Sequence, residues 1–264
     1  MKNYLLMVLI TLFSLSANGG SQANKESTIE PEKIIKFAKD VEKYAANQGA
    51  RAFIIARVGR PENQLPKGIH YTHTAIAVYS SIQLDNGETA KGYAIHNLYQ
   101  VEGKPNKSQL MQDYPVDFFW GAQQLKAGII IPNEELQTRL IKLIATGENQ
   151  KLHNPKYSVI ANPMNSQRQN CTEYTLDLIN AAIYQTLDTN QLKANTRAHF
   201  TAQKVKTSPF KLMFGSLLMD DVTTKDHKGK VATATFSSIY TYLDKYQLAN
   251  SAVSFYENGT TELL

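Results

Sequence analysis

The sequence predicts an α+β fold in a single domain, and three observations lead to this prediction. Stretches with helical apolar periodicity alternate along the chain with short apolar runs that end at Gly, Pro or Asn-Gly turns. The runs at residues 73–79 and 91–101 flank the turn signal Asp85-Asn86-Gly87-Glu88, which is typical of an antiparallel hairpin. A helix that begins at Cys171 is apolar on nearly all sides, as expected when the fold wraps around it.

The helices and strands follow from apolar periodicity and from capping and breaking residues. Pro31 and Asn133 are favourable helix starts, whereas Gly49 and Gly147 end the helical patterns before them. Residues 188–207 continue as a more polar helical stretch. We expect helices at residues 31–47, 133–144, 171–187 and 237–248, and strands at 52–58, 73–79, 91–101, 127–131, 157–161, 231–236 and 252–256.

Residues 1–23 have the features of a secretory signal peptide. Lys2 supplies a positive charge, residues 4–15 form an apolar run, and Ser21-Gln22-Ala23 is a cleavage site, with Ala17-Asn18-Gly19 as the alternative. The apolar run is too short to span a bilayer, and no cysteine lies near the cleavage site to carry a lipid anchor. We therefore expect residues 24–264 to form one periplasmic or secreted domain without an integral membrane segment.

The composition describes an ordinary globular protein with a mildly basic balance. Of the 264 residues, 42% are hydrophobic and 19% are charged, and the formal net charge is +5. The Lys and Arg residues are scattered, and no basic stripe with interleaved aromatic residues is present. A nucleic-acid partner is therefore not expected, whereas an anionic surface or cell-wall polymer is compatible with the charge. The sequence does not indicate an oligomeric state.

Cys171 is the only cysteine and the first candidate for chemistry. Exported proteins use cysteines mainly in disulfide pairs, so a lone cysteine is either buried filler or functional. Asn170 is a good N-cap, and Glu173 stands where a capping-box carboxylate reaches back to the cap. Cys171 then falls in the first helical turn, where free N–H groups and the helix dipole favour a thiolate.

Two histidines are the candidate partners of this thiol. His73 and His96 each lie on a predicted strand of the same hairpin, and a cross-strand pair on one face stands about 5 Å apart. That is the geometry of a base and the group that orients it. Asn97 is the alternative orienter, because a register slip of one residue exchanges the faces.

A metal site is the weaker interpretation of these histidines. His70 and His73 are an odd number of residues apart and would point to opposite faces of a strand. No Asp or Glu stands nearby at ligand spacing, so we expect neither a metal nor another cofactor. The aromatic run Phe118-Phe119-Trp120 is more typical of a core than of a substrate platform.

The order of these parts resembles the circularly permuted NlpC-type papain-like superfamily. In that group a small-apolar strand begins with the histidine, as in His73-Thr74-Ala75-Ile76-Ala77-Val78, and precedes the cysteine helix. The helix pattern Cys-Ser/Thr-Glu is matched by Cys171-Thr172-Glu173. The mature chain also resembles an exported bacterial family of unknown function, in the segments Ala56-Arg57-Val58-Gly59-Arg60, Tyr71-Thr72-His73, Tyr157-Ser158-Val159-Ile160-Ala161 and Gln169-Asn170-Cys171. One departure is the opening strand, because Ile54-Ile55-Ala56-Arg57-Val58-Gly59 replaces the usual Gly-Asp strand.

The resemblance implies an antiparallel sheet packed against the cysteine helix, and a thiol hydrolase or acyltransferase. Cys171 would attack an acyl carbon, His73 would move the proton, and His96 or Asn97 would orient His73. The substrates implied are cell-wall stem peptides or lipid acyl groups. The main-chain N–H of Cys171 would contribute to the oxyanion hole, and Gln169 or Tyr157 would add a side-chain donor. Asn170 and Trp120 complete the expected substrate contacts.

A second interpretation keeps the same fold without catalysis. In it the chain is a binding or structural protein of the cell envelope, which uses the aromatic residues around Trp120 as its contact surface. Cys171 is then buried and inert to thiol reagents. The two interpretations differ in where the structure places the sulfur relative to His73.

Overall fold

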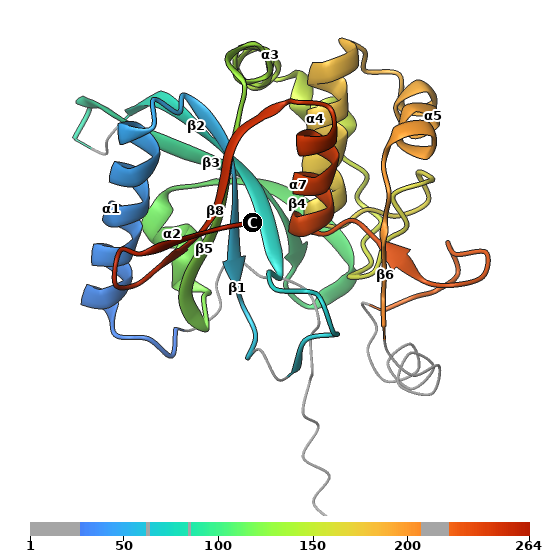
Figure 1. Ribbon diagram of the computed structural model, residues 1–264, viewed down its shortest axis with the longest axis horizontal. Coiled ribbons are helices and arrows are strands. Elements are labelled where there is room, and N and C mark those ends of the chain that lie inside the picture. Colours follow the sequence, from blue (N-terminus) through green and yellow to red (C-terminus); the bar gives the residue numbers. More distant parts are fainter. Residues whose placement is uncertain (1–26, 62–63, 84–85, 207–221) are drawn as a thin grey trace, which may run out of the picture.

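The centre of the protein is an antiparallel sheet, as the sequence predicts. The computed structural model describes residues 27–61, 64–83, 86–206 and 222–264, and this part of the chain contains a seven-stranded sheet of order β4-β3-β2-β1-β5-β8-β9 (Figure 1). Every neighbouring pair is antiparallel. The strands are β1 (Ala52–Val58), β2 (His73–Gln83), β3 (Thr89–Val101), β4 (Lys104–Asp113), β5 (Gln124–Pro132), β8 (Ala249–Tyr256) and β9 (Thr261–Leu263).

Helices cover both faces of this sheet. α1 (Pro31–Asn47) and α2 (Pro115–Trp120) lie on one side, called here the α1 face. α3 (Glu134–Ala145), α4 (Cys171–Tyr184) and α7 (Phe236–Lys245) lie on the other, the α4 face (Figure 1). Outside them are α5 (Thr189–His199), the short 3-10 helix η2 (Glu148–Leu152) and the small pair β6 (Gln203–Lys204) and β7 (Ala232–Thr233).

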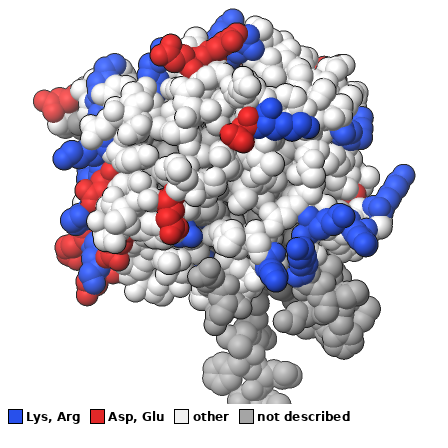
Figure 2. Space-filling model, in the orientation of Figure 1, with Lys and Arg blue, Asp and Glu red and all other residues white. Residues whose placement is uncertain are grey.

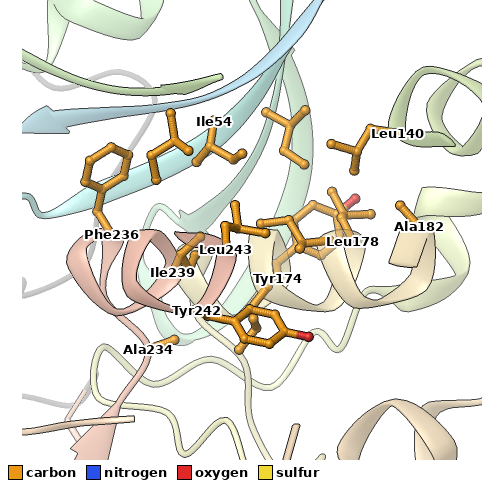
Figure 3. Close-up of a cluster of buried hydrophobic side chains, with 14 of the residues drawn as sticks. Ile54, Leu140, Tyr174, Leu178, Ala182, Ala234, Phe236, Ile239, Tyr242 and Leu243 are labelled. Carbon is orange, nitrogen blue, oxygen red and sulfur yellow. The ribbon is translucent and has the colours of Figure 1, made fainter. Parts of the chain in front are cut away.

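Side chains alternate between these faces and form two cores. Ile54 and Ile76 point to the α4 face, where they meet α4 and α7, as Figure 3 shows for Ile54, Leu178 and Leu243. The next residues, Ile55 and Ala77, belong to the core beneath α1. Because β1 and β2 are buried on both faces, each reads in the sequence as a continuous apolar run rather than an alternating one.

α4 is enclosed by the fold, and this confirms the expectation from its composition. Its residues are buried without interruption from Cys171 to Ala182. The Asn170 side chain caps the helix by accepting the N–H of Glu173 at 2.9 Å. The Glu173 carboxylate does not complete a capping box, because it binds Lys193 of α5 instead.

Two predicted strands need correction, and one further strand was not predicted. Residues 157–161 do not form a strand: Tyr157 makes only an isolated bridge to Gln169. The strand expected at 231–236 is reduced to β7. β4 was not predicted, because its residues Lys104–Asp113 are mostly polar and lie at the edge of the sheet, where little apolar surface is buried.

The proposed signal peptide lies outside the described residues. None of the helices within the described ranges is both long and apolar enough to cross a membrane. On the face in Figure 2, Asp and Glu lie mostly on the side of α1 and at the top, and Lys and Arg gather at the lower right.

Candidate functional site

Cys171 is held against the open beginning of β2. β2 pairs with β1 from His73 onward, but its pairing with β3 begins only at Ile76. The first turn of α4 occupies the free side of this strand. Thr175 Oγ1 donates to the carbonyl oxygen of Thr74 at 3.3 Å, and Cys171 Sγ lies 4.0 Å from the carbonyl oxygen of Thr72. The thiol therefore faces the main chain on both sides of His73.

The His73 ring points to the α1 face and is completely buried. Its Nε2 lies 2.9 Å from Asn97 Oδ1. The Asn97 amide nitrogen donates to Ile95 O and to Asp113 Oδ2, both at 3.1 Å, so the amide oxygen is the atom that faces His73. His73 Nε2 consequently carries the hydrogen, and Nδ1 is left as an acceptor.

His73 Nδ1 has no hydrogen-bond partner among the described residues. A buried nitrogen without a partner is costly, and such atoms concentrate at functional sites. The charge of Arg57 acts on both the sulfur and this imidazole, and Tyr99, which stacks on His73, is close enough to Cys171 for a charge on the sulfur to affect it. Within the described part of the chain, His73 Nδ1 is therefore a basic nitrogen without a partner, and the main chain on either side of His73 contacts the thiol.

A buried polar network supports the His73 ring. The ring stacks on Tyr99 with centroids 4.7 Å apart and an interplanar angle of 7°. The Tyr99 hydroxyl donates to Asp113 Oδ2 at 2.5 Å, the same oxygen that accepts from Asn97. Asp113 thus holds both the amide that orients His73 and the ring on which His73 stacks.

Arg57 places a buried positive charge in this network. Its guanidinium lies over Phe118 and Tyr99, 5.1 Å and 5.6 Å from the ring centroids, and donates to the carbonyl oxygen of Phe118. Gly121 makes room for it, since a Cβ there would stand 2.9 Å from Arg57 Nη2. A cation in this position opposes protonation of His73 and favours a negative sulfur.

Burial keeps the thiol and the imidazole neutral in the resting protein. Burial, followed by the charge of Arg57, lowers the pKa of His73 well below its usual value, although Asn97 opposes the shift. Burial raises the pKa of the Cys171 thiol, against hydrogen bonds from Thr74 and Thr172 and the charge of Arg57. Burial also raises the pKa of Asp113. In the resting protein the thiol therefore keeps its proton and the imidazole is unprotonated.

Cys171 lies in the wall of a cavity of ≈ 240 Å³ on the α4 face. Asn170, Thr172, Tyr157 and Thr72 line the same cavity. The cysteine itself is only 5% exposed, and this cavity is the space beside it.

The match to a family model follows the geometry of the site. A model for uncharacterised proteins conserved in bacteria, DUF2145, matches residues 44–243, which include Cys171, His73, Asn97 and Asp113. The chain belongs to this family. The chain matches no curated protein and no solved structure.

His96 does not lie beside His73, contrary to one of the two sequence hypotheses. Within this DUF2145 chain His96 pairs with Ile76 and so shares the α4 face, whereas Asn97 shares the α1 face with His73. The alternative orienter, Asn97, is the residue in contact. Burial lowers the pKa of His96 to about 4.

Of the four expected substrate contacts, two line the cavity beside Cys171 and two do not. Asn170 and Tyr157 line the cavity beside Cys171. Gln169 does not: its amide nitrogen donates to Leu152 O and Asp177 Oδ2, so it offers no free donor to an oxyanion. Trp120, on the α1 face, packs against the core there and is not among the residues lining the Cys171 cavity.

Arg57, Tyr99 and Asp113 were not predicted as site residues. Arg57 has one visible signal, because it is the only charged residue within an apolar strand run of residues 52–58. A buried cation in such a strand needs a specific partner. Asp113 had none, since it ends a strand that the sequence pattern did not reveal.

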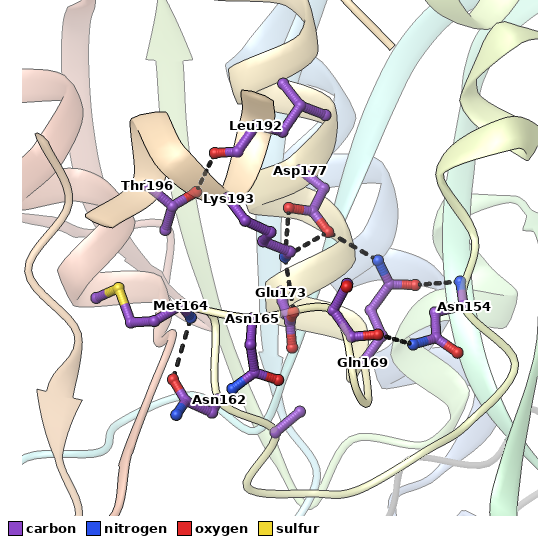
Figure 4. A network of polar contacts seen from close by, with 12 residues as sticks. Asn154, Asn162, Met164, Asn165, Gln169, Glu173, Asp177, Leu192, Lys193 and Thr196 are labelled. Carbon is purple, nitrogen blue, oxygen red and sulfur yellow. Dashed lines mark hydrogen bonds and ion pairs between the residues drawn. The ribbon is translucent and has the colours of Figure 1, made fainter. Parts of the chain in front are cut away.

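A second buried polar cluster joins α4 to α5 (Figure 4). Lys193 Nζ binds Glu173 Oε1 at 2.8 Å and Asp177 Oδ1 at 2.8 Å. Burial raises the pKa of Glu173 to about 8, against the opposing charge of Lys193. Across the described ranges, no group of three or more His, Cys, Asp or Glu side chains is arranged to hold a metal ion.

Proposed function

We propose that this protein is an exported papain-like cysteine hydrolase or acyltransferase acting on an amide or ester bond. Cys171 is the nucleophile, His73 is the base, and Asn97 orients His73. The observation that carries the proposal is the fixed His73 tautomer. Asn97 occupies Nε2 and leaves Nδ1 unpaired, on a residue whose neighbours Thr72 and Thr74 contact the thiol.

The proposed reaction begins with proton transfer from the Cys171 thiol to His73 Nδ1, while the sulfur attacks the acyl carbon. Catalytic hydrogen bonds are often long in unliganded sites, and we propose that the sulfur and Nδ1 meet when substrate enters. The C–N or C–O bond then breaks, and the imidazolium protonates the departing amine or alcohol. Water, or an acceptor alcohol or amine, next gives its proton to His73 and attacks the thioester, which restores the thiol.

The oxyanion of the intermediate needs donors near the sulfur. The main-chain N–H groups at the start of α4 are the candidates, since the first four N–H groups of a helix have no partner within it. The Asn170 side chain is not available, because its Nδ2 donates to Val159 O and Thr233 Oγ1. Main-chain donors therefore serve without the additional Gln169 amide, which is engaged elsewhere.

The burial of Cys171 is the observation that favours the non-catalytic alternative. The Cys171 thiol is 5% exposed and its pKa is raised, and both properties are also typical of a structural cysteine. The two functions differ in whether the cavity gives access to the sulfur.

Alkylation of the native protein with iodoacetamide between pH 6 and 10 separates the two. An accessible Cys171 is labelled, and the rate rises with pH beyond 9, since the raised pKa keeps the thiol protonated below that value. Mass spectrometry identifies the labelled peptide. A thiol that reacts only after unfolding in urea overturns the proposal.

The catalytic claim is tested with p-nitrophenyl acetate and octanoate as ester probes. Cys171→Ser and His73→Ala are each expected to lower kcat/KM at least about 100-fold, because nucleophile and base act as a unit. Circular dichroism and urea unfolding check that each variant is folded. Unchanged hydrolysis in both folded variants contradicts the proposal.

A further inference from the structure

The cavity beside Cys171 has a wall that is mainly apolar. Its side chains include Leu65, Ile69, Val159, Ile160, Val205 and Val222. Arg60 is the single charged side chain among the described residues that line it. The lining residues thus contrast with those of the second cavity, of ≈ 600 Å³, which include Lys151, Lys156, Arg168 and Lys225.

Four polar side chains that line the Cys171 cavity are already engaged within the protein. Thr233 Oγ1 donates to Ala161 O at 2.9 Å, and Thr235 Oγ1 donates to Gln203 Oε1 at 2.8 Å. Thr172 Oγ1 donates to Thr74 Oγ1, and both ends of the Asn170 amide are bonded. These groups keep the hydroxyls and the amide satisfied without a ligand, so the cavity offers few donors to a charged guest.

This chemistry distinguishes the two substrate classes that the sequence left open. A cell-wall stem peptide carries carboxylates and an ammonium group, and burying such ions without partners is strongly unfavourable. An acyl chain carries no polar atom beyond its carbonyl carbon. Its methylenes gain free energy by leaving water for an apolar wall.

We propose that the cavity holds an aliphatic acyl chain, so that Cys171 acts on a fatty acyl ester or amide and not on a stem peptide. The assignment of the bond to Cys171 rests on the proposed function, whereas binding of the chain does not. The carbonyl carbon lies at the sulfur, and the chain extends along Val159 and Ile69. During turnover the acyl C–O or C–N bond breaks and an acyl–sulfur bond forms, and water then releases the fatty acid and restores the thiol.

Binding is measured by calorimetry on the Cys171→Ala variant, with hexanoate, octanoate and dodecanoate as probes. Each added CH2 is expected to tighten Kd by up to roughly fourfold. In the Cys171→Ala background, Val159→Trp, which fills the cavity, weakens dodecanoate binding at least tenfold. Ala46→Trp, at an exposed position of α1, leaves it unchanged. A synthetic stem pentapeptide shows no saturable binding.

Failure of this inference and failure of the proposed function give different results. Dodecanoate that binds no tighter than hexanoate, or equally well to the Val159→Trp variant, overturns the acyl-chain inference, even if Cys171 hydrolyses short esters. Chain-length-dependent binding sensitive to Val159→Trp supports it, even if the wild-type protein turns over none of the p-nitrophenyl esters. If the wild-type protein both binds the acyl chain and hydrolyses the p-nitrophenyl esters, kcat/KM rises from the acetate to the dodecanoate ester.

Discussion

The tautomer of His73 is determined by residues that do not contact the thiol. The Asn97 amide can face the imidazole with either end, and Asp113 and Ile95 O determine which, because both accept from Nδ2. The sequence led to His73 and Cys171, whose types and positions are local signals. It left His96 and Asn97 open, since a one-residue change in register exchanges them. The contact between Asp113 and Asn97 depends on how β4 pairs with β3, and the sequence pattern did not reveal β4.

Asn97→Ala and His96→Asn form a matched pair that tests this assignment. Asn97→Ala removes the partner of His73 Nε2, so kcat/KM for the ester probes falls by about 100-fold. The buried groups left unpaired cost about 1–3 kcal/mol of the free energy of unfolding. His96→Asn lies on the other face and leaves kcat/KM within about twofold. A larger loss of activity in His96→Asn than in Asn97→Ala contradicts the assignment.

At the scale of elements, the polar side of α4 is covered by α5. Glu173 and Asp177 look in sequence like a solvated face, yet both are buried beneath Lys193. Apolar periodicity predicted the helix correctly because its other sides are core. It could not reveal α5 as the cover, since a pairing across 16 and 20 residues leaves no local pattern. The same limit hid β4, whose polar residues pair along an edge.

The ion cluster predicts unequal effects of two substitutions. Lys193→Met leaves the buried Asp177 carboxylate without its cation and Glu173 without its hydrogen-bond donor, and is expected to cost about 3–5 kcal/mol of unfolding free energy. Glu173→Gln costs less than about 1.5 kcal/mol at pH 7, because a group with a pKa of about 8 is already largely protonated there. Urea unfolding measures both. Equal destabilisation by the two substitutions contradicts the protonated state assigned to Glu173.

At the scale of the whole molecule, the two strand histidines make stability depend on pH. His73 is buried and His96 is half-buried, and both are neutral, so the unfolded chain binds their protons near pH 6.5 whereas the folded chain does not. The free energy of unfolding contributed by His96 therefore falls as pH drops from 6.5 to about 4, and it is constant above 6.5. Glu173 has the opposite sign, since the folded chain retains its proton up to about pH 8.

A comparison of wild type with His96→Asn isolates the histidine from Glu173. The difference in unfolding free energy between pH 7 and pH 4 is expected to shrink in the variant by up to about 3 kcal/mol, since one pKa unit corresponds to about 1.4 kcal/mol. His70→Asn is the matched control, because His70 is exposed. Urea unfolding at half-unit steps of pH supplies the profiles. Parallel profiles for wild type and His96→Asn contradict the neutral state of His96 in the folded chain.

β2 is not paired with β3 before Ile76, and this limits what mutagenesis can detect at the thiol. There the sulfur meets peptide groups of Thr72 and Thr74, which every amino acid except proline supplies. Alanine scanning leaves these groups in place and therefore does not detect their contribution to the environment of the Cys171 thiol. Replacement of the Thr74 amide by an ester in a semisynthetic chain would remove a donor and expose that share. Variation at positions 72 and 74 within the family is, for the same reason, compatible with a preserved thiol site.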